Sequence, residues 1–486
     1  MPDALLLSGP VAAPLVTAAL YPAVGWRPAT AWAGLFSPAV ILACAGALAT
    51  EVLRHGPVTA YAALLRADAL TVWILLGIGA VGALACAAGP AYLAAERTDP
   101  VDARRYGLLV HLFLAAMALA TLTANLGVLW VAIEATTIVT AFLVGHRRTR
   151  AGVEAAWKYV VICSVGIALA FLGTVLVYFA ARHAGIPESR ALDWPTLIAH
   201  ADRLDQPTLR LGTALAVLGF GAKAGLVPLH AWLPDAHSQA PAPVSALMSG
   251  VLLAVAFTAV LRHKVLADAA LGTGFARTLL IAVALATLAL AAVLLLAQRD
   301  YKRMLAYSSM EHMSLIALAA GVGTRLATAA LLLHMAGHGL AKGAAFCSSG
   351  HLAHLAHTTR VGRVRGLLGR ARALGAVLGL ALLALLALPP FSLFASELGI
   401  ARAGFDAGLG WTVALALVLV LVAFAAIAVR GARMLLGPPP GPAAPVTVGA
   451  SVWLPMAAAL AACAALGVTV APLRELLDAA AAIGGR

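Results

Sequence analysis

The chain has 486 residues, of which 62% are hydrophobic and only 11% are charged. A soluble domain is about a quarter charged, so this composition excludes an ordinary soluble protein. The net charge of +13 does not indicate nucleic-acid binding, because most of the excess Lys and Arg lies in short loops between apolar segments, where it sets membrane orientation. The five cysteines stand singly, without the spacing of a zinc site or an iron–sulfur cluster. We therefore expect no metal, cofactor or redox centre in this chain.

Apolar blocks of about 20 residues recur along the chain, and each is long enough to cross about 30 Å of hydrocarbon. They predict an all-α polytopic membrane protein with about fourteen transmembrane helices. No basic region precedes the first block, so we expect it to stay as a helix and not to be a cleaved signal peptide. The predicted spans begin near residues 4, 31, 68, 106, 125, 158, 211, 242, 277, 304, 326, 373, 410 and 447.

The spans group into a three-helix segment, two five-helix repeats and a last helix. Spans 4–8 and 9–13 form the repeats, and because five is odd, we expect the two to be inverted relative to each other. The polar stretch 182–210 is predicted to be a connection and the Pro-rich stretch 437–445 a linker. The predicted boundaries are 1–105, 106–265, 266–435 and 436–486.

The loops after odd-numbered spans carry 17 Lys and Arg and those on the other side 13. This excess predicts that both termini lie outside the cytoplasm. Lys302 and Arg303 flank a span and read as ordinary cytoplasmic charges. His351, His354 and His357 have a spacing that could suit a metal, but no carboxylate or thiol is nearby, and we expect a solvated cytoplasmic loop.

Ionisable residues inside spans are informative, because each costs about 2.5–3.5 kcal/mol at a helix centre. Glu134 lies in the middle of span 5 and Lys223 in the middle of span 7, and we predict that they pair. The alternative is a static ion pair that only joins two helices. Lys158 opens span 6, where it could instead extend its ammonium group to the membrane surface.

A second group of ionisable residues lies in the later spans. His334, His338 and Lys342 follow at i, i+4 and i+8, which places them on one helical stripe with about 6 Å of rise per step. We interpret this stripe as a water-bridged proton path; the alternative is histidines bonded to neighbouring helices. Glu311 and His312 lie in the preceding span.

Prolines interrupt spans 7 and 12. Pro228 follows Lys223 by five residues, and Glu397 follows Pro389-Pro390. A proline removes a helical hydrogen bond, and free backbone groups at membrane depth are tolerated only beside water or protein. Glu311 follows Glu134 by 177 residues and Glu397 follows Lys223 by 174. These matching positions favour an internal repeat with ion sites at the membrane centre.

Several long motifs then resemble a known family: LWVAIEATT, AKAGLVPLHAWLPDAH, YKRMLAYSSMEHMS, HGLAKGAAF and LPPFSLFASE. They are similar to the proton-translocating, antiporter-like membrane subunits of complex I and membrane-bound hydrogenases, most of all to the hydrogenase-4 component F type of formate hydrogenlyase. The resemblance runs from about Tyr106 to Arg430. It implies fourteen helices, discontinuous helices 7 and 12 and a polar axis through the membrane centre.

The resemblance also implies roles for particular residues. The implied proton-transfer residues are Glu134, Lys158, Lys223, His334, His338, Lys342 and Glu397. To these we add, as our own expectation, Glu311 and His312 for proton transfer and His230, Asp235 and His237 for proton entry. Span 8 departs from some relatives, with Ser249 and Ala254 in place of a lysine or histidine. We therefore expect the link between the two halves to run through water or through Glu311 and His312.

The implied function is that of a proton-translocating subunit of a respiratory or hydrogenase oxidoreductase complex in a prokaryotic inner membrane. Its expected partners are lipid, other membrane subunits and redox subunits on the cytoplasmic side, which would be of the NADH:quinone oxidoreductase or nickel–iron hydrogenase kind. The chain ends about 20 residues after its last span, so we expect no long lateral helix. The alternatives are a sodium/proton antiporter or inorganic-carbon uptake subunit and, in another class, a membrane scaffold with inert ion pairs.

Overall fold

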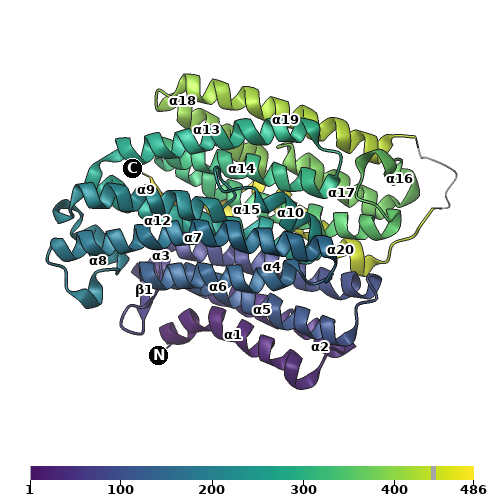
Figure 1. Ribbon diagram of the computed structural model, residues 1–486, viewed down its shortest axis with the longest axis horizontal. Helices are drawn as coiled ribbons and strands as arrows, with labels where there is room; N and C mark the ends of the chain where they lie inside the picture. Colours follow the sequence, from purple (N-terminus) through teal and green to yellow (C-terminus); the bar gives the residue numbers. More distant parts are fainter. Residues whose placement is uncertain (1, 439–444, 486) are drawn as a thin grey trace.

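The computed structural model describes residues 2–438 and 445–485, and most of the predicted linker 437–445 lies outside the described residues. Long helices lie side by side along one common direction (Figure 1). The N-terminal segment comprises α1 (Pro2–Val24), α2 (Pro28–Ala33), α3 (Phe36–His55) and α4 (Ala69–Ala95). An antiparallel hairpin of β1 (Val58–Ala60) and β2 (Leu65–Ala67) joins α3 to α4, with Val58 opposite Ala67.

Two units of five crossings follow. The first comprises α5 (Pro100–Leu122), α6 (Leu126–Val144), α7 (Arg150–His183), the broken helix α9 (Gln206–Lys223) and α10 (Trp232–Gln239), and the continuous α11 (Ala242–Leu247), π-helical η3 (Met248–Leu252) and α12 (Leu253–Leu271). The second comprises α13 (Thr273–Ala297), α14 (Tyr301–Val322), α15 (Arg325–Ala356), the broken helix α17 (Arg372–Leu385) and α18 (Ser392–Asp406), and α19 (Gly410–Leu436). The C-terminal part comprises α20 (Ala450–Val468) and α21 (Arg474–Gly484).

Short helices fill the connections. The polar stretch 182–210 contains η1 (Glu188–Arg190), α8 (Trp194–Ala199) and η2 (Ala201–Arg203). Later connections contain η4 (Val361–Arg363), α16 (Leu367–Arg370) and η5 (Ala471–Leu473). In Figure 1, α8 and both chain termini lie at the left end of the bundle, and α2 and α16 lie at the right end. We name these the α8 end and the α16 end.

The predicted all-α membrane fold is confirmed. Within the described residues, ten helices are long and apolar enough to cross a membrane. The broken helices α9–α10 and α17–α18, together with α14 and α15, complete fourteen crossings among the described residues. These four contain most of the charged residues predicted inside spans. The breaks leave α10, α17 and α18 too short to span alone, and charged residues and histidines lower the hydropathy of α14 and α15.

The two units repeat with opposite orientation, as predicted. In the first unit α5 packs on α6, α6 on α7 and α7 on α9; in the second α13 packs on α14, α14 on α15 and α15 on α18. In Figure 1, α9–α10 run from left to right and α17–α18 from right to left. Equivalent broken helices therefore cross the membrane in opposite directions.

The break between α9 and α10 follows from its sequence. Pro228 lacks a backbone donor, and Gly225 has φ +81°, which lets the chain turn out of the helix. The freed groups are satisfied locally: the Val227 amide donates to Thr287 Oγ1 at 3.1 Å, and Trp232 Nε1 donates to the Ala222 carbonyl at 3.0 Å. The interruption is thus tolerated at membrane depth.

Candidate functional site

Lys223 is the last residue of α9, lies at the break and is 0% exposed. Its ammonium group donates to Thr137 Oγ1 of α6 at 2.8 Å and to the Tyr159 hydroxyl of α7 at 2.5 Å. Tyr159 also shares a 2.5 Å hydrogen bond with Thr140, and its ring centroid lies 4.7 Å from the Lys223 nitrogen. We call Glu134, Thr137, Thr140, Tyr159 and Lys223 the Lys223 cluster.

The predicted direct pair between Glu134 and Lys223 is wrong. Glu134 lies one turn before Thr137 on α6, but its carboxylate is not within 4.0 Å of the Lys223 nitrogen. One carboxylate oxygen, Oε2, is buried and has no hydrogen-bond partner among the described residues. The Thr137 and Tyr159 hydroxyls take the ammonium contacts instead, while Glu134 stays within electrostatic range of Lys223.

Lys342 lies in a second buried cluster, between α14 and α15. Its ammonium group donates to the Leu305 carbonyl and to Ser308 Oγ, both at 2.7 Å. His334, His338 and Lys342 are each at most 1% exposed. The stripe predicted from their spacing therefore lies on a buried face of α15.

His312 of α14 joins the two histidines of the stripe. Its Nδ1 lies 3.1 Å from His334 Nε2, and its ring centroid lies 5.2 Å from those of both His334 and His338. Successive stripe positions are about 6 Å apart along the helix axis, so a side chain from another helix is needed to bring them into contact.

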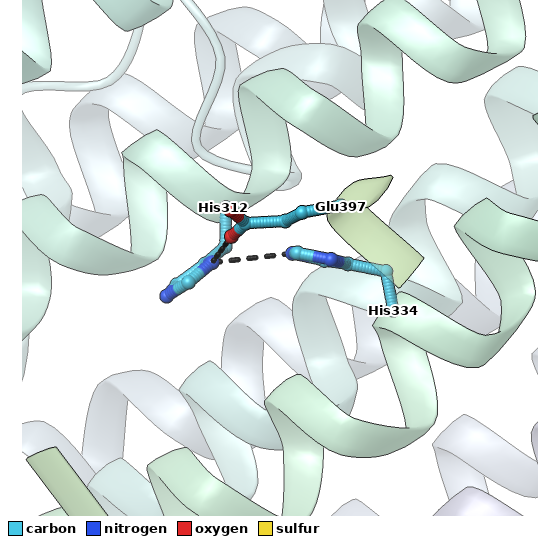
Figure 2. A group of neighbouring side chains, drawn as sticks. All are labelled: His312, His334 and Glu397. Carbon is cyan, nitrogen blue, oxygen red and sulfur yellow. Dashed lines mark hydrogen bonds and ion pairs between the residues drawn. The ribbon is translucent and has the colours of Figure 1, made fainter. Parts of the chain in front are cut away.

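Figure 2 shows His312, His334 and Glu397 converging from α14, α15 and α18. His312 Nδ1 lies 4.0 Å from Glu397 Oε1, and His312 Nε2 lies 3.9 Å from Glu311 Oε2. His334 Nδ1 lies 2.9 Å from Ser396 Oγ. Glu397 is 19% exposed whereas His312 is fully buried, so Glu397 is where this group approaches the surface. We call Glu311, His312, His334, His338, Lys342 and Glu397, with Ser308 and Ser396, the Lys342 cluster.

One ligand atom each from His312, His334 and Glu397 lies within 4.8 Å of the other two, a spacing that could suit a metal ion. However, the facing nitrogens of the two histidines share a hydrogen bond. The absence of a metal at this group stays a prediction.

The three residues at which protons could enter do not come together. Asp235 lies in a cavity of about 390 Å³ that also contains Lys158 and Lys302. His230 is partly exposed, with Nδ1 3.2 Å from the Pro228 carbonyl. His237 is 0% exposed and does not line this cavity.

Lys158 lies at this cavity and not in the Lys223 cluster. Its ammonium group pairs with Glu154 at 2.7 Å and with Asp235 at 3.4 Å, and Asp235 also pairs with Arg303. The Lys158 side chain is 47% exposed. The next residue along α7 is Tyr159 of the Lys223 cluster, but consecutive residues of a helix do not face each other, so the cavity and the Lys223 cluster lie against different faces of α7.

Two further expectations about charged residues are wrong. Lys302 is 1% exposed and lines the cavity, and is not a solvated flanking charge. His351 and His354 lie on α15, with ring centroids 6.1 and 5.3 Å from that of Tyr92, and not in a solvated loop. The helix continues to Ala356 because the sequence there contains neither proline nor glycine.

Sequence reasoning missed the hydroxyls that hold the charged groups and two buried ion pairs. Arg262 pairs with Asp68 at 2.7 Å, and Lys264 pairs with Asp268 at 2.8 Å and donates to the Gly484 carbonyl at 2.9 Å. The Arg262–Asp68 pair ties α12 to the start of α4, and the hydrogen bond from Lys264 to Gly484 ties α12 to α21. The missed hydroxyls belong to Thr137, Thr140, Tyr159, Ser308 and Ser396. The signal available in the sequence was that a threonine, serine or tyrosine inside a span is polar.

Comparisons with known proteins agree with this architecture. Residues 123–423 match the family described as NADH:quinone oxidoreductase/Mrp antiporter, transmembrane region. The chain is 36% identical over 409 residues to a hydrogenase-4 component F homolog from Methylacidiphilum infernorum, covering 83% of this chain and 85% of the relative. It is 30% identical over 359 residues to NADH-quinone oxidoreductase subunit N from Deinococcus radiodurans, covering 72% and 70%.

Solved structures share the fold. A chain of the archaeal membrane-bound sulfane sulfur reductase complex matches with a TM-score of 0.87 at 24% identity, covering 99% of this chain and 97% of the other. A chain of the Mrp complex from Dietzia sp. matches with a TM-score of 0.87 at 21% identity and the same coverage. These neighbours are parts of multi-subunit membrane complexes. The chain belongs to the NADH:quinone oxidoreductase/Mrp antiporter family, as a multi-pass, antiporter-like membrane subunit of the complex I and membrane-bound hydrogenase type.

Proposed function

We propose that this chain translocates protons as a membrane subunit of a respiratory or hydrogenase oxidoreductase complex, driven by electron transfer in partner subunits. The observation that carries the proposal is the set of buried lysines and histidines and buried or partly buried glutamates inside the spans, from α6, α9, α14, α15 and α18. Such residues are expensive in a membrane and are retained for a function. The names of the relatives from Methylacidiphilum infernorum and Deinococcus radiodurans support an oxidoreductase complex.

The proposed path begins at the cavity of Lys158 and Asp235 near the α16 end. Tyr159, the next residue on α7 after Lys158, bonds to Lys223 at 2.5 Å, and water between the cavity and this hydroxyl would carry the proton to the central lysine. Lys223 exchanges its proton when the field of nearby Glu134 changes. A redox-driven movement in a partner subunit would supply that change.

The second half of the path runs through the Lys342 cluster. From Lys342 the proton passes to His338, then to His312, which contacts both other histidines. His312 Nδ1 lies 3.1 Å from His334 and 4.0 Å from Glu397. A rotation of the His312 ring would therefore bring its proton to Glu397, where the path ends. Glu397 then releases the proton to the α8 side, because it is the most exposed of these groups.

Protons suit these clusters better than sodium ions. Hard cations are bound through oxygen ligands, whereas in the Lys342 cluster the Leu305 and Ser308 oxygens already accept from the Lys342 ammonium group, and His312 faces His334 through a ring nitrogen. A sodium/proton antiporter with this arrangement would need an oxygen-lined site elsewhere in the chain or in a partner.

The orientation of the subunit is proposed from its charges. The α16 end carries the loops richer in Lys and Arg, so it faces the cytoplasm, together with the redox partners. Both termini then lie on the opposite side.

The test uses the intact complex in inside-out membrane vesicles. Lys223→Ala and Glu397→Gln should each lower the rate of proton uptake at least tenfold, because each removes a group of the path. Proton uptake in the wild type should persist without sodium. If both variants assemble normally and take up protons at the wild-type rate, the chain is instead a membrane scaffold. If proton uptake depends on sodium, the chain is instead a sodium/proton antiporter.

A further inference from the structure

His237 on α10 is a fully buried histidine whose ring nitrogens both lack a hydrogen-bond partner among the described residues. Its backbone carbonyl accepts a hydrogen bond from Ser245 Oγ at 3.1 Å, so the backbone is held in place while the imidazole is not bonded. Buried polar groups are almost always hydrogen-bonded, and an exception calls for an explanation such as a bound water or a functional role.

The position of His237 separates it from the other buried histidines. Its ring stacks on Phe346 of α15 with centroids 4.9 Å apart and an interplanar angle of 24°. Phe346 lies one turn after Lys342 on α15, on the same face of that helix. Lys342 and His338 also lie within electrostatic range of His237. His237 therefore borders the Lys342 cluster.

On its other side His237 faces the Lys223 cluster across one aromatic ring. The Trp232 ring lies 6.4 Å from that of His237 and 5.0 Å from that of Tyr159. Tyr159 holds Lys223 directly. Trp232 donates its Nε1 hydrogen to the Ala222 carbonyl, so it is fixed between the two rings.

Span 8 offers no ionisable side chain near its middle, where Ser249 lies. Ser249 of η3 and Ser309 of α14 share a 2.7 Å hydrogen bond, and Ser309 follows Ser308, the partner of Lys342. A serine hydroxyl can pass a proton along a hydrogen-bond chain but does not hold one at neutral pH. Imidazole can both hold a proton and accept at one nitrogen while donating at the other.

We propose that His237 is the titratable link that carries protons between the Lys223 cluster and the Lys342 cluster. Water molecules bonded to its two free nitrogens complete the connection, one along the Trp232 indole toward Tyr159 and one toward Lys342. This inference rests on the proposed proton translocation, and it replaces the expected link through Glu311 and His312. It also changes the role of His237, from a group that takes up protons at the surface to one inside the protein.

The first test compares His237→Phe with His263→Phe in the intact complex in inside-out vesicles. His263 is a matched control, because it is also 0% exposed, has an unbonded Nε2 and packs on an aromatic ring, Phe220 of α9, whereas its contacts with Phe220 and the Ala259 carbonyl do not reach the Lys342 cluster. We expect His237→Phe to lower proton uptake per electron at least fivefold and His263→Phe to leave it unchanged. Equal uptake in the two variants would overturn the proposal.

A second variant keeps the proposal testable if His237→Phe does not assemble. His237→Gln retains hydrogen-bonding groups without the ability to titrate, and it should lose uptake to the same extent. In His237→Ala, added imidazole should restore uptake and pyrrole, of similar size but with no accepting nitrogen, should not. Restoration by both compounds would indicate a packing role and contradict the link. The Lys223→Ala variant distinguishes the proposed link from the proposed proton translocation. If Lys223→Ala loses proton uptake and His237→Gln keeps it in full, the link through His237 is refuted and the translocation is not.

Discussion

The Tyr159 hydroxyl joins two groups that sequence reasoning treats separately. It lies 2.5 Å from both the Lys223 nitrogen and Thr140 Oγ1. A hydroxyl accepts a hydrogen bond from an ammonium group without adding the negative charge that would fix the proton there. The lysine is thereby positioned while Glu134, nearby but not in contact, remains able to act on it through space. This separation of positioning from charge is what a switchable proton site requires.

Tyr159→Phe should therefore impair transport more than stability. Removing the hydroxyl leaves Lys223 and Thr140 each without one partner, which costs about 1–3 kcal/mol, and it frees the ammonium group to move. We expect proton uptake to fall at least threefold while the complex still assembles. Tyr178→Phe on the same helix is the control, because Tyr178 packs edge-on against Phe179 outside the Lys223 cluster. Similar uptake in the two variants would show that the Tyr159 hydroxyl has no role.

Charged residues within spans could be recognised from the sequence, and their neighbours could not. Glu134, Lys223 and Glu397 stand out because a charge in a membrane span is costly. Threonine, serine and tyrosine cost much less, so Thr137, Ser308 and Tyr159 gave little signal. The same limit explains the mistaken direct pair of Glu134 and Lys223, because which atom reaches an ammonium group depends on how three helices pack.

At the scale of helices, the close contact of α7 with α9 sets the position of Lys223. A Cβ at Gly173 would lie 2.6 Å from the Gly212 carbonyl oxygen, and one at Gly219 would collide with the backbone of Ala170. Small residues at such a contact let two membrane helices approach closely. Gly219 lies one turn before Lys223 on α9, so this contact holds the end of the broken helix beside Tyr159.

Gly219→Val should push α9 away from α7 and lower the yield of folded protein severalfold. Overpacking of this kind typically costs about 1–3 kcal/mol. Gly46→Ala is the control, because a Cβ at this helical position in α3 meets nothing within 4 Å. Detergent-solubilised variants can be compared by size-exclusion chromatography and thermal unfolding. A Gly219→Val protein as stable as Gly46→Ala would refute the role of this contact.

The element order and the two broken helices followed from apolar block length and from proline placement. The alignment of neighbouring helices along their length could not be predicted from these features. The three histidines of HLAHLAH were expected in a loop, yet α15 extends to Ala356 and two of them pack against Tyr92 of α4. The contact with a helix distant in sequence could not be predicted from the spacing of the histidines.

At the scale of the whole molecule, polarity differs between the two ends of the bundle. The α16 end contains two polar cavities, of about 390 and 500 Å³, which Arg147 lines in common. Arg147 bonds to the Tyr92 hydroxyl at 2.5 Å and pairs with Glu96. Lys and Arg are also more frequent in the loops at this end. The proposed cytoplasmic orientation therefore puts the two polar cavities on the side from which protons are taken up.

Labelling of single cysteines can check this orientation. Arg365 lies beside α16 and Asp202 lies in η2 near α8, and both are exposed. In a background with the partly exposed Cys44 replaced by Ala, a membrane-impermeant maleimide should label Asp202→Cys in intact cells and Arg365→Cys only in inside-out vesicles. The reverse pattern would place the α16 end outside the cytoplasm and contradict the proposed direction of transport.

The most direct measurement of the central claim is the number of protons moved per electron by the intact complex with Lys342→Ala. Lys264→Ala is the matched control, because Lys264 is also a buried lysine, 3% exposed, but is held in a static pair with Asp268. If buried lysines of the central clusters carry protons, Lys342→Ala lowers the proton-to-electron ratio while electron transfer continues, and Lys264→Ala affects only stability. An unchanged ratio in an assembled Lys342→Ala complex would contradict proton translocation through this chain.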